Sequence, residues 1–448
     1  MSKLHRTIAA AVLIGLSAAG LTACSSSSTP GAAEESACTP SKGKVTLTYW
    51  SWISQGLDKV VASFNASHPD ITVKVNTIVG GEAYQDYYNS FKAGKSPDLG
   101  MIEYDRIPEF RAADRLRDIS ACKPVAGLKD RVLPFSYDQV TLGTDAVYAT
   151  PTDVGTLGLY YRRDLFKQYG LAEPTTWAEF EADAEKLKAA NPKIKMASLT
   201  PQDVSTVNGL MWQAGARPFS YEGDSFALDM KSATMTKVAD YWQRMIDEKL
   251  IDTSAPPFSP ALYAAWNKGT IASYIGPSWM SFILQQSAAG TSGKWGVLPL
   301  PAWSEGERGG GSWGGAATSV FKGSKHPYEA AVFANWLSTS PEANTILFGG
   351  GGQSASTKWA TSGAYDKPFP FFGGQPVSQV FDRSAKETSP SFQWAPDQTN
   401  VNGYLQDALA GAFTGSSTIK EAFAATQQKA VADLKSQSIP VVEKQAAP

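Results

Sequence analysis

The stretch Val147-Tyr148-Ala149-Thr150-Pro151-Thr152-Asp153 decides how this chain of 448 residues is interpreted. It begins as a short strand and turns polar at a proline, which is typical of a strand that leaves one folded body and enters another. A chain of this length supports two large domains or up to three ordinary ones. We therefore expect at least two bodies, with the chain crossing between them here.

Upstream of this crossing, strand and helix patterns alternate. Residues 45–50 and 71–75 read as strands, and residues 57–64 between them place apolar side chains at helical spacing. A helix over 84–91 then leads to a short apolar strand at 99–102. This order predicts an α/β body with a mainly parallel sheet, in which ligands bind beyond the carboxyl ends of the strands. Those ends carry Ser51-Trp52 and Glu103-Tyr104-Asp105-Arg106.

A second α/β pattern follows the crossing. Thr176 and Glu179 form a capping box at the start of a helix, and Thr418 and Glu421 form another before the last helix. Amphipathic helices are also expected over 235–246 and after Pro327. Both bodies therefore belong to the same fold class.

The N-terminus has the features of an export signal. Two basic residues precede an apolar run over 8–21, which ends in Leu21-Thr22-Ala23-Cys24 and resembles a bacterial lipobox. We expect residues 1–23 to be a lipoprotein signal peptide and residues 24–44 to be a lipidated Cys24 and a flexible tether. Each buried CH2 of an acyl chain such as palmitate adds about 0.8 kcal/mol of membrane affinity. The alternative is an ordinary signal peptide with a chance cysteine.

Composition excludes several classes of function. The chain carries 40 Lys and Arg against 42 Asp and Glu, so no basic surplus indicates nucleic-acid binding. Three His and three Cys are too few for the common zinc sites, and we expect neither a metal nor a cofactor. With Cys24 lipidated in an oxidising compartment, Cys38 and Cys122 form the one possible disulfide. Two free buried thiols are the alternative.

One stretch matches the residues of an enzyme motif but lacks the strand and helix that the motif requires. Gly310-Gly311-Ser312-Trp313-Gly314 matches the G-x-S-x-G nucleophile elbow, which needs a strand directly before it and a helix directly after it. The only downstream histidine is His326, and no acidic residue lies between it and the serine. We therefore interpret the stretch as a glycine-rich loop. Paired carboxylates of a glycoside hydrolase remain open, because 42 acidic residues allow many pairs.

Several further segments matter by their order and spacing. They are the lipobox, residues 96–98 (SPD), 147–155 (VYATPTDVG), 159–166 (LYYRRDLF), 174–180 (PTTWAEF), 268–272 (KGTIA), 276–279 (GPSW) and 297–301 (VLPLP). Together they resemble the extracellular solute-binding proteins of bacterial ABC transporters, specifically the maltose- and oligosaccharide-binding family, over residues 45–434. Arg162 stands where many members have Asn, and we interpret that position as structural.

The resemblance implies a two-lobed α/β fold of the periplasmic-binding-protein type. Each lobe would be a mainly parallel sheet flanked by helices, with the ligand cleft between the lobes. Residues 45–150 and 298–340 would form lobe 1, and residues 151–297 and 341–448 would form lobe 2. It further implies that the protein captures a mono- or oligosaccharide and delivers it to the membrane permease subunits of an ABC importer, without catalysis. We expect an exported monomer, anchored by lipid to the outer face of the cytoplasmic membrane.

The resemblance also implies which side chains meet the sugar. Aromatic rings suit the apolar face of a pyranose, and carboxylate, amide and guanidinium groups suit its hydroxyls. The candidates are Trp279, Trp394, Asp153, Trp52, Glu103, Trp313, Tyr104, Asp105, Arg106, Asp203 and Gln353. The alternatives are a lipid-anchored glycoside hydrolase and a binder of a non-sugar solute.

Overall fold

The computed structural model describes residues 38–53, 55–79, 83–222, 225–349, 351–363 and 366–444. The expected signal peptide, Cys24 and the first part of the tether lie outside the described residues, so these expectations stay predictions. The chain from Cys38 onward forms one compact unit. No helix in the described ranges is both long and apolar enough to cross a membrane.

The first lobe is built on a five-stranded sheet with the order β2-β1-β3-β10-β4. The strands are β1 (Val45–Ser51), β2 (Ile71–Thr77), β3 (Leu99–Glu103), β4 (Ala149–Pro151) and β10 (Ala316–Val320). β1 runs parallel to β2 and β3, whereas β10 is antiparallel to β3 and β4. The expected mainly parallel sheet is therefore confirmed for this lobe.

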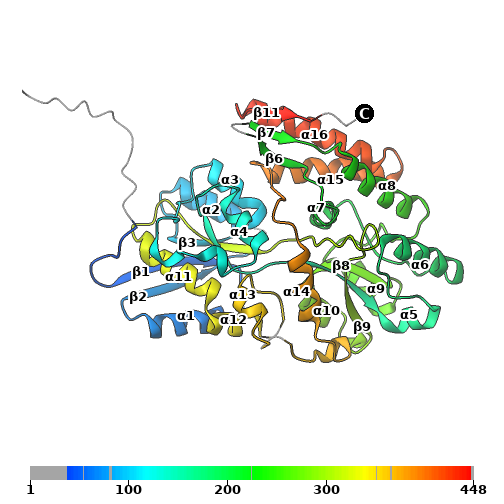
Figure 1. Cartoon of the computed structure of the whole chain (residues 1–448), viewed down its shortest axis with the longest axis horizontal. Coiled ribbons are helices and arrows are strands. Elements are labelled where there is room, and N and C mark those ends of the chain that lie inside the picture. The colour runs from blue at the N-terminus through cyan, green and yellow to red at the C-terminus, as the bar shows by residue number, and fades with distance from the viewer. Residues whose placement is uncertain are drawn as a thin grey trace, which may run out of the picture. The chain divides into compact units, whose positions relative to one another are not determined.

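Helices from both halves of the chain cover this sheet. They are α1 (Leu57–Ser67), α2 (Ala83–Lys92), α3 (Ile107–Ala112), α4 (Pro134–Thr141), α11 (Pro327–Thr339) and α12 (Pro341–Phe348). The apolar positions of α1 are buried, as their helical spacing requires. In Figure 1 the yellow α11 and α12 lie beside the blue α1, and both helices pack against it. The expected change of lobe after residue 340 is thus wrong, because α12 buries its apolar face in the first lobe.

The second lobe contains a three-stranded sheet of a different kind. β5 (Leu157–Arg162) lies between β8 (Ser273–Pro277) and β9 (Trp295–Pro299) and is antiparallel to both. The expectation of a mainly parallel sheet is wrong for this lobe. Apolar patterns predict where a strand lies but not the direction in which it runs. Here β5 lies between two strands that come later in the chain and run opposite to it.

The second lobe also contains helices from the middle and the end of the chain. They are α5 (Arg163–Tyr169), α6 (Trp177–Ala190), α7 (Val204–Gln213), α8 (Ala233–Asp247), α9 (Pro260–Lys268), α10 (Met280–Ser287), α14 (Val377–Glu387), α15 (Gln398–Thr414) and α16 (Ile419–Ser436). Both predicted capping boxes are present, at the starts of α6 and α16. A small sheet of β6 (Phe219–Glu222), β7 (Ser225–Leu228) and β11 (Val441–Glu443) completes the lobe.

The chain crosses between the lobes three times. The first crossing runs from β4 to β5, over residues 152–156. The return lies between β9 and β10, later than the expected residue 298, because Ala302 still bridges Thr176 and Gly310 bridges Thr388 in the second lobe. After α12, a short helix α13 (Thr357–Ala360) follows a bridge from Ser356 to Val132 of the first lobe. The chain then enters α14, which packs against β5 and β9.

The structure also shows the pairing of Cys38 with Cys122 and the surroundings of Arg162. Cys38 and Cys122 are joined by a disulfide with the Cα atoms 5.1 Å apart, so the start of the folded chain is tied to the first lobe. Nearby, the backbone N–H of Ser41 donates to Glu329 Oε1 at 2.6 Å. In the second lobe, Arg162 is buried, donates two hydrogen bonds to the carboxylate of Asp164 and donates to the carbonyl of Trp266. These bonds give Arg162 the structural role expected for it.

Candidate ligand-binding site

A cavity lies where the two lobes and the return crossing meet. Its volume is about 40 Å³. The first lobe contributes residues that follow β3, the second lobe contributes α7 and the segment between α14 and α15, and the crossing contributes part of its glycine-rich loop. The lining residues are Glu103, Tyr104, Asp105, Ser205, Asn208, Ser312, Trp313, Gly314 and Trp394.

Carboxylates occupy the first-lobe side of this cavity. Glu103 accepts a hydrogen bond of 3.0 Å from the Tyr84 hydroxyl, and burial raises the pKa of Glu103 above its ordinary value. Burial also raises the pKa of Asp105 to about 7, and the nearby negative charge of Glu103 adds to that rise. These groups are the natural acceptors for hydroxyl donors of a ligand.

Asp153 lies behind this wall, at the first crossing. Its carboxylate accepts a 2.9 Å hydrogen bond from the backbone N–H of Ala316, and its carbonyl accepts one from the Tyr104 hydroxyl. Burial raises the pKa of Asp153 to about 7. Asp153 therefore joins β10 to the tyrosine that lines the cavity. In the described ranges, no cluster of three or more His, Cys, Asp or Glu side chains could hold a metal ion.

Two tryptophans give the cavity its apolar surface. Trp394 donates its Nε1–H to Gln139 Oε1 of the first lobe, and its ring packs edge-on against Phe392 at 4.9 Å between centroids. Trp313 is half-buried and belongs to the return crossing. Its ring meets the edge of Trp279 at 5.4 Å, and Phe258 lies 5.9 Å from Trp313. The cavity thus combines two indole rings with hydrogen-bonding groups.

The glycine-rich loop lies close against α7. A Cβ atom added at Gly311 would come within 2.0 Å of the carbonyl oxygen of Gly209, so only glycine fits there. The Ser312 hydroxyl donates to the Gly314 carbonyl, and the loop leads into strand β10 rather than a helix. This local structure is that of a close-packed loop and lacks the strand–turn–helix form of a nucleophile elbow.

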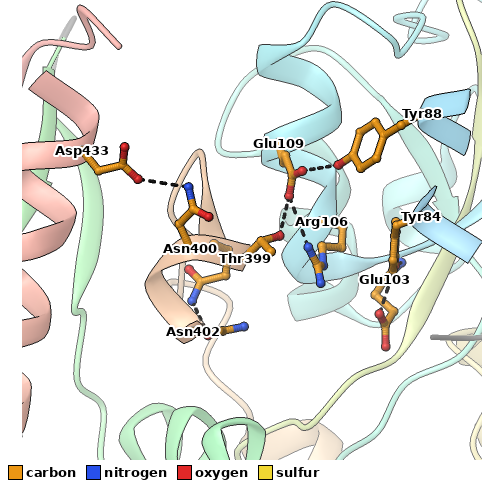
Figure 2. A network of polar contacts seen from close by, with 10 residues as sticks. Tyr84, Tyr88, Glu103, Arg106, Glu109, Thr399, Asn400, Asn402 and Asp433 are labelled. Atoms are coloured by element: carbon orange, nitrogen blue, oxygen red, sulfur yellow. Dashed lines mark hydrogen bonds and ion pairs between the residues drawn. The ribbon is translucent and has the colours of Figure 1, made fainter. Parts of the chain in front are cut away.

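A polar network links the site to the second lobe, as Figure 2 shows. The guanidinium of Arg106 is 3.4 Å from Glu109 Oε2 and lies 4.7 Å from the centre of the Tyr84 ring. Glu109 also accepts hydrogen bonds from the Tyr88 hydroxyl and, at 2.7 Å, from the Thr399 hydroxyl at the start of α15. Glu109 therefore bonds to both lobes and holds Arg106.

The structure brings five of the predicted residues to the cavity wall: Glu103, Tyr104, Asp105, Trp313 and Trp394. Asp153 and Trp279 lie behind that wall, where Asp153 contacts Tyr104 and Trp279 contacts Trp313. Arg106 follows Asp105 in the chain but does not line the cavity. The other three lie elsewhere. Gln353 is only 2% exposed and bonds to Thr156 and the Phe381 carbonyl at the crossing, Asp203 accepts two bonds from Thr200, and Trp52 packs near Tyr84.

Several further residues lie at or near the site that were not among the predicted ones. Ser205 and Asn208 line the cavity one turn apart on α7, directly after the predicted Asp203, so an i, i+3 reading of that helix start could have found them. Phe258 stacks near Trp279 with 47% of its surface exposed and with a φ of 61°. A bulky residue in that left-handed conformation has no signal in sequence alone.

The protein has two lobes joined by three crossings. The cavity between the lobes is lined by indole rings and hydrogen-bonding side chains. This is the arrangement of a protein that encloses a small polar ligand. The chain belongs to the family of bacterial extracellular solute-binding proteins, and residues 50–345 are the part that matches this family.

Individual relatives agree with this assignment. The arabinooligosaccharide-binding protein of Bacillus subtilis (strain 168) is 28% identical over 68% of this chain and 72% of its own length. The lactose-binding protein of Rhizobium radiobacter is 27% identical over 76% of this chain and 81% of its own. The structure is similar to the galacto-N-biose-/lacto-N-biose I-binding protein of the ABC transporter from Bifidobacterium longum, solved in complex with lacto-N-biose. Their TM-score is 0.77, with 26% identity, 90% coverage of this chain and 100% of that one. These relatives are binding proteins rather than enzymes.

Proposed function

We propose that this protein captures a carbohydrate, of oligosaccharide length, in the cavity between its lobes and delivers it to the permease of an ABC importer. The observation that carries the proposal is the combination of Trp313 and Trp394 with Glu103, Asp105 and Asn208 around one cavity. The relatives named above bind arabinooligosaccharides, lactose and lacto-N-biose according to their names, which supports the same ligand class here.

The chemistry of the wall suits a sugar. A pyranose presents C–H bonds on its faces, which pack against indole rings, and hydroxyls on its rim, each of which can donate and accept a hydrogen bond. Carboxylate oxygens accept from those hydroxyls, and the Asn208 amide can do both. The wall therefore offers partners to both parts of the ligand.

The proposal includes the protein's place in the cell. Membership of an extracellular family indicates export. We further propose that Cys24 carries the lipid that holds the protein at the outer face of the cytoplasmic membrane, as a monomer beside its permease. Replacement by Cys24→Ala should leave the protein unlipidated and released or unprocessed, as measured by membrane fractionation. A membrane fraction equal to that of the wild type would contradict lipid anchoring at this residue.

The ligand class is tested by a thermal-shift screen against neutral mono- and oligosaccharides and a comparison set of non-sugar solutes, followed by calorimetry. A ligand that binds only the folded state raises the melting temperature, and the rise grows with the logarithm of the ratio of ligand concentration to dissociation constant once that ratio is well above one. We expect at least one oligosaccharide to raise it and to be recovered chemically unchanged after prolonged incubation. Turnover of that sugar would favour the glycoside hydrolase alternative. A response confined to non-sugar solutes would reject the carbohydrate proposal.

A further inference from the structure

The charges around the cavity are unbalanced. Glu103 and Asp105 contribute carboxylates to its lining, whereas the described lining residues include no Lys, Arg or His. Asp153 places a third carboxylate directly behind Tyr104, to which it is hydrogen-bonded through its carbonyl. A ligand that enters this cavity therefore meets acceptors of negative character on the first-lobe side.

Arg106 is close enough to Glu103 and Asp105 for its charge to lower the pKa of both, but it does not line the cavity. The guanidinium of Arg106 is directed to Glu109 and lies over the Tyr84 ring, as Figure 2 shows. Glu109 is itself fixed by the hydroxyls of Tyr88 and Thr399. Arg106 would have to break its ion pair and leave the ring before it could reach a ligand carboxylate.

The electrostatic surroundings already disfavour negative charge. The pKa values of Asp105 and Asp153 are both raised to about 7, first of all by burial, and Glu103 adds a repulsive charge at Asp105. A ligand anion would experience the same loss of solvation and the same repulsion. An ammonium group would instead be attracted by these carboxylates.

We propose that this site selects sugars by charge: it accepts neutral and amino sugars and rejects sugars that carry a carboxylate, sulfate or phosphate. This inference rests on the proposed carbohydrate-binding function and narrows its ligand class. Two unit charges about 5 Å apart at an effective dielectric constant of about 20 repel strongly enough to weaken binding by roughly 250-fold.

The test compares matched sugars. Disaccharides of glucose and galactose, their counterparts oxidised at C6 to uronates, and their 2-amino counterparts are titrated calorimetrically at pH 7.5. We expect the uronate to bind at least 30-fold more weakly than the neutral disaccharide of the same linkage, and the amino sugar to bind at least as tightly as the neutral one. Equal affinities for the neutral sugar and its uronate would overturn the inference, whereas the absence of binding by every sugar would instead reject the proposed function.

Variants separate charge selection from a poor steric fit of the uronate. Glu103→Gln and Asp105→Asn remove one negative charge each and should lower the uronate-to-neutral ratio of dissociation constants at least fivefold, whatever they do to neutral sugars. Glu185→Gln, on the exposed face of α6, is the matched control and should leave the ratio unchanged. A ratio that stays constant in all three variants would show that shape and not charge excludes the uronate.

Discussion

At the scale of single residues, Trp313 and Trp279 differ in their position relative to the cavity. Trp313 lines the cavity, while Trp279 meets the edge of Trp313 from behind. Trp313→Ala should therefore weaken sugar binding by roughly 30- to 1,000-fold, the cost of removing an aromatic anchor of about 2–4 kcal/mol. Its half-buried ring also packs against the apolar core of the second lobe, so we expect a moderate fall in melting temperature as well, and the affinity is measured at a temperature where the variant is folded.

Trp279→Ala provides the comparison for Trp313→Ala, with calorimetry and thermal unfolding measured on both variants. We expect a smaller loss of affinity than for Trp313→Ala, because the Trp279 ring supports its neighbour rather than the cavity wall. A larger loss would place the sugar against the stacked rings of Phe258 and Trp279, which are 6.2 Å apart. A collapse of the melting temperature with normal affinity would mark Trp279 as a core residue.

A second residue-scale prediction concerns the buried carboxylate of Asp153. Its pKa is about 7 in the folded protein and about 3.8 when exposed, so the folded state binds a proton that the unfolded state has released between these values. This contribution therefore lowers stability as the pH rises from about 4 to about 7. Asp153→Asn removes it and still accepts the hydrogen bond from Ala316.

Urea unfolding at pH 4.5 and pH 8 measures this effect. The wild type should lose on the order of 1–3 kcal/mol more than Asp153→Asn between the two pH values. Asp145→Asn, an exposed carboxylate of the same lobe, should follow the wild type. Parallel stability curves for the wild type and Asp153→Asn would mean that Asp153 is ionised in the folded protein near its ordinary pKa.

At the scale of elements, the disulfide ties the start of the folded chain to the first lobe. Cys38 and Cys122 are 84 positions apart, and disulfides that close loops of this size commonly contribute about 2–4 kcal/mol. The pair Cys38→Ala and Cys122→Ala should lower the free energy of unfolding by less than this, because Ser41 keeps the segment bound to Glu329. Thiol titration of the unfolded, unreduced protein should find neither cysteine reactive, and two reactive thiols per chain would refute the bond.

Elements were predictable where local chemistry decides them. The capping boxes at Thr176 and Thr418 and the spacing of apolar residues in α1 specify a helix start or face by themselves. The antiparallel order of β8, β5 and β9 was not predictable, because pairing joins strands more than a hundred residues apart. The sequence could show that Ser205 and Asn208 share one face at the start of α7, but only the packing of α7 against the opposite lobe brings that face to the cavity.

At the scale of the whole folded unit, the cavity is lined by residues of both lobes and of the return crossing. Bodies joined by short crossings can move as hinged units, and a ligand that contacts both of them favours the closed form. We therefore expect the lobes to open when a sugar enters or leaves. Hydrogen bonds between lobes oppose that opening: Thr399 donates to Glu109, and Gln139 of α4 bonds to the carbonyl of Phe392 at 2.7 Å.

Thr399→Val should shift this equilibrium toward the open form. The substitution keeps the side chain's shape, removes one hydrogen bond to a carboxylate worth about 1.5–3 kcal/mol at most, and leaves Glu109 bonded to Tyr88 and Arg106. Because the sugar favours the closed form, the variant should bind it about 3- to 10-fold more weakly with little change in melting temperature.

Small-angle scattering should show a larger radius of gyration for the ligand-free variant than for the wild type, and saturating sugar should bring both to the same smaller value. Thr414→Val, an exposed threonine at the far end of α15, should behave as the wild type does. Scattering that is unchanged by sugar, with binding measured independently, would contradict closure of the lobes around the ligand.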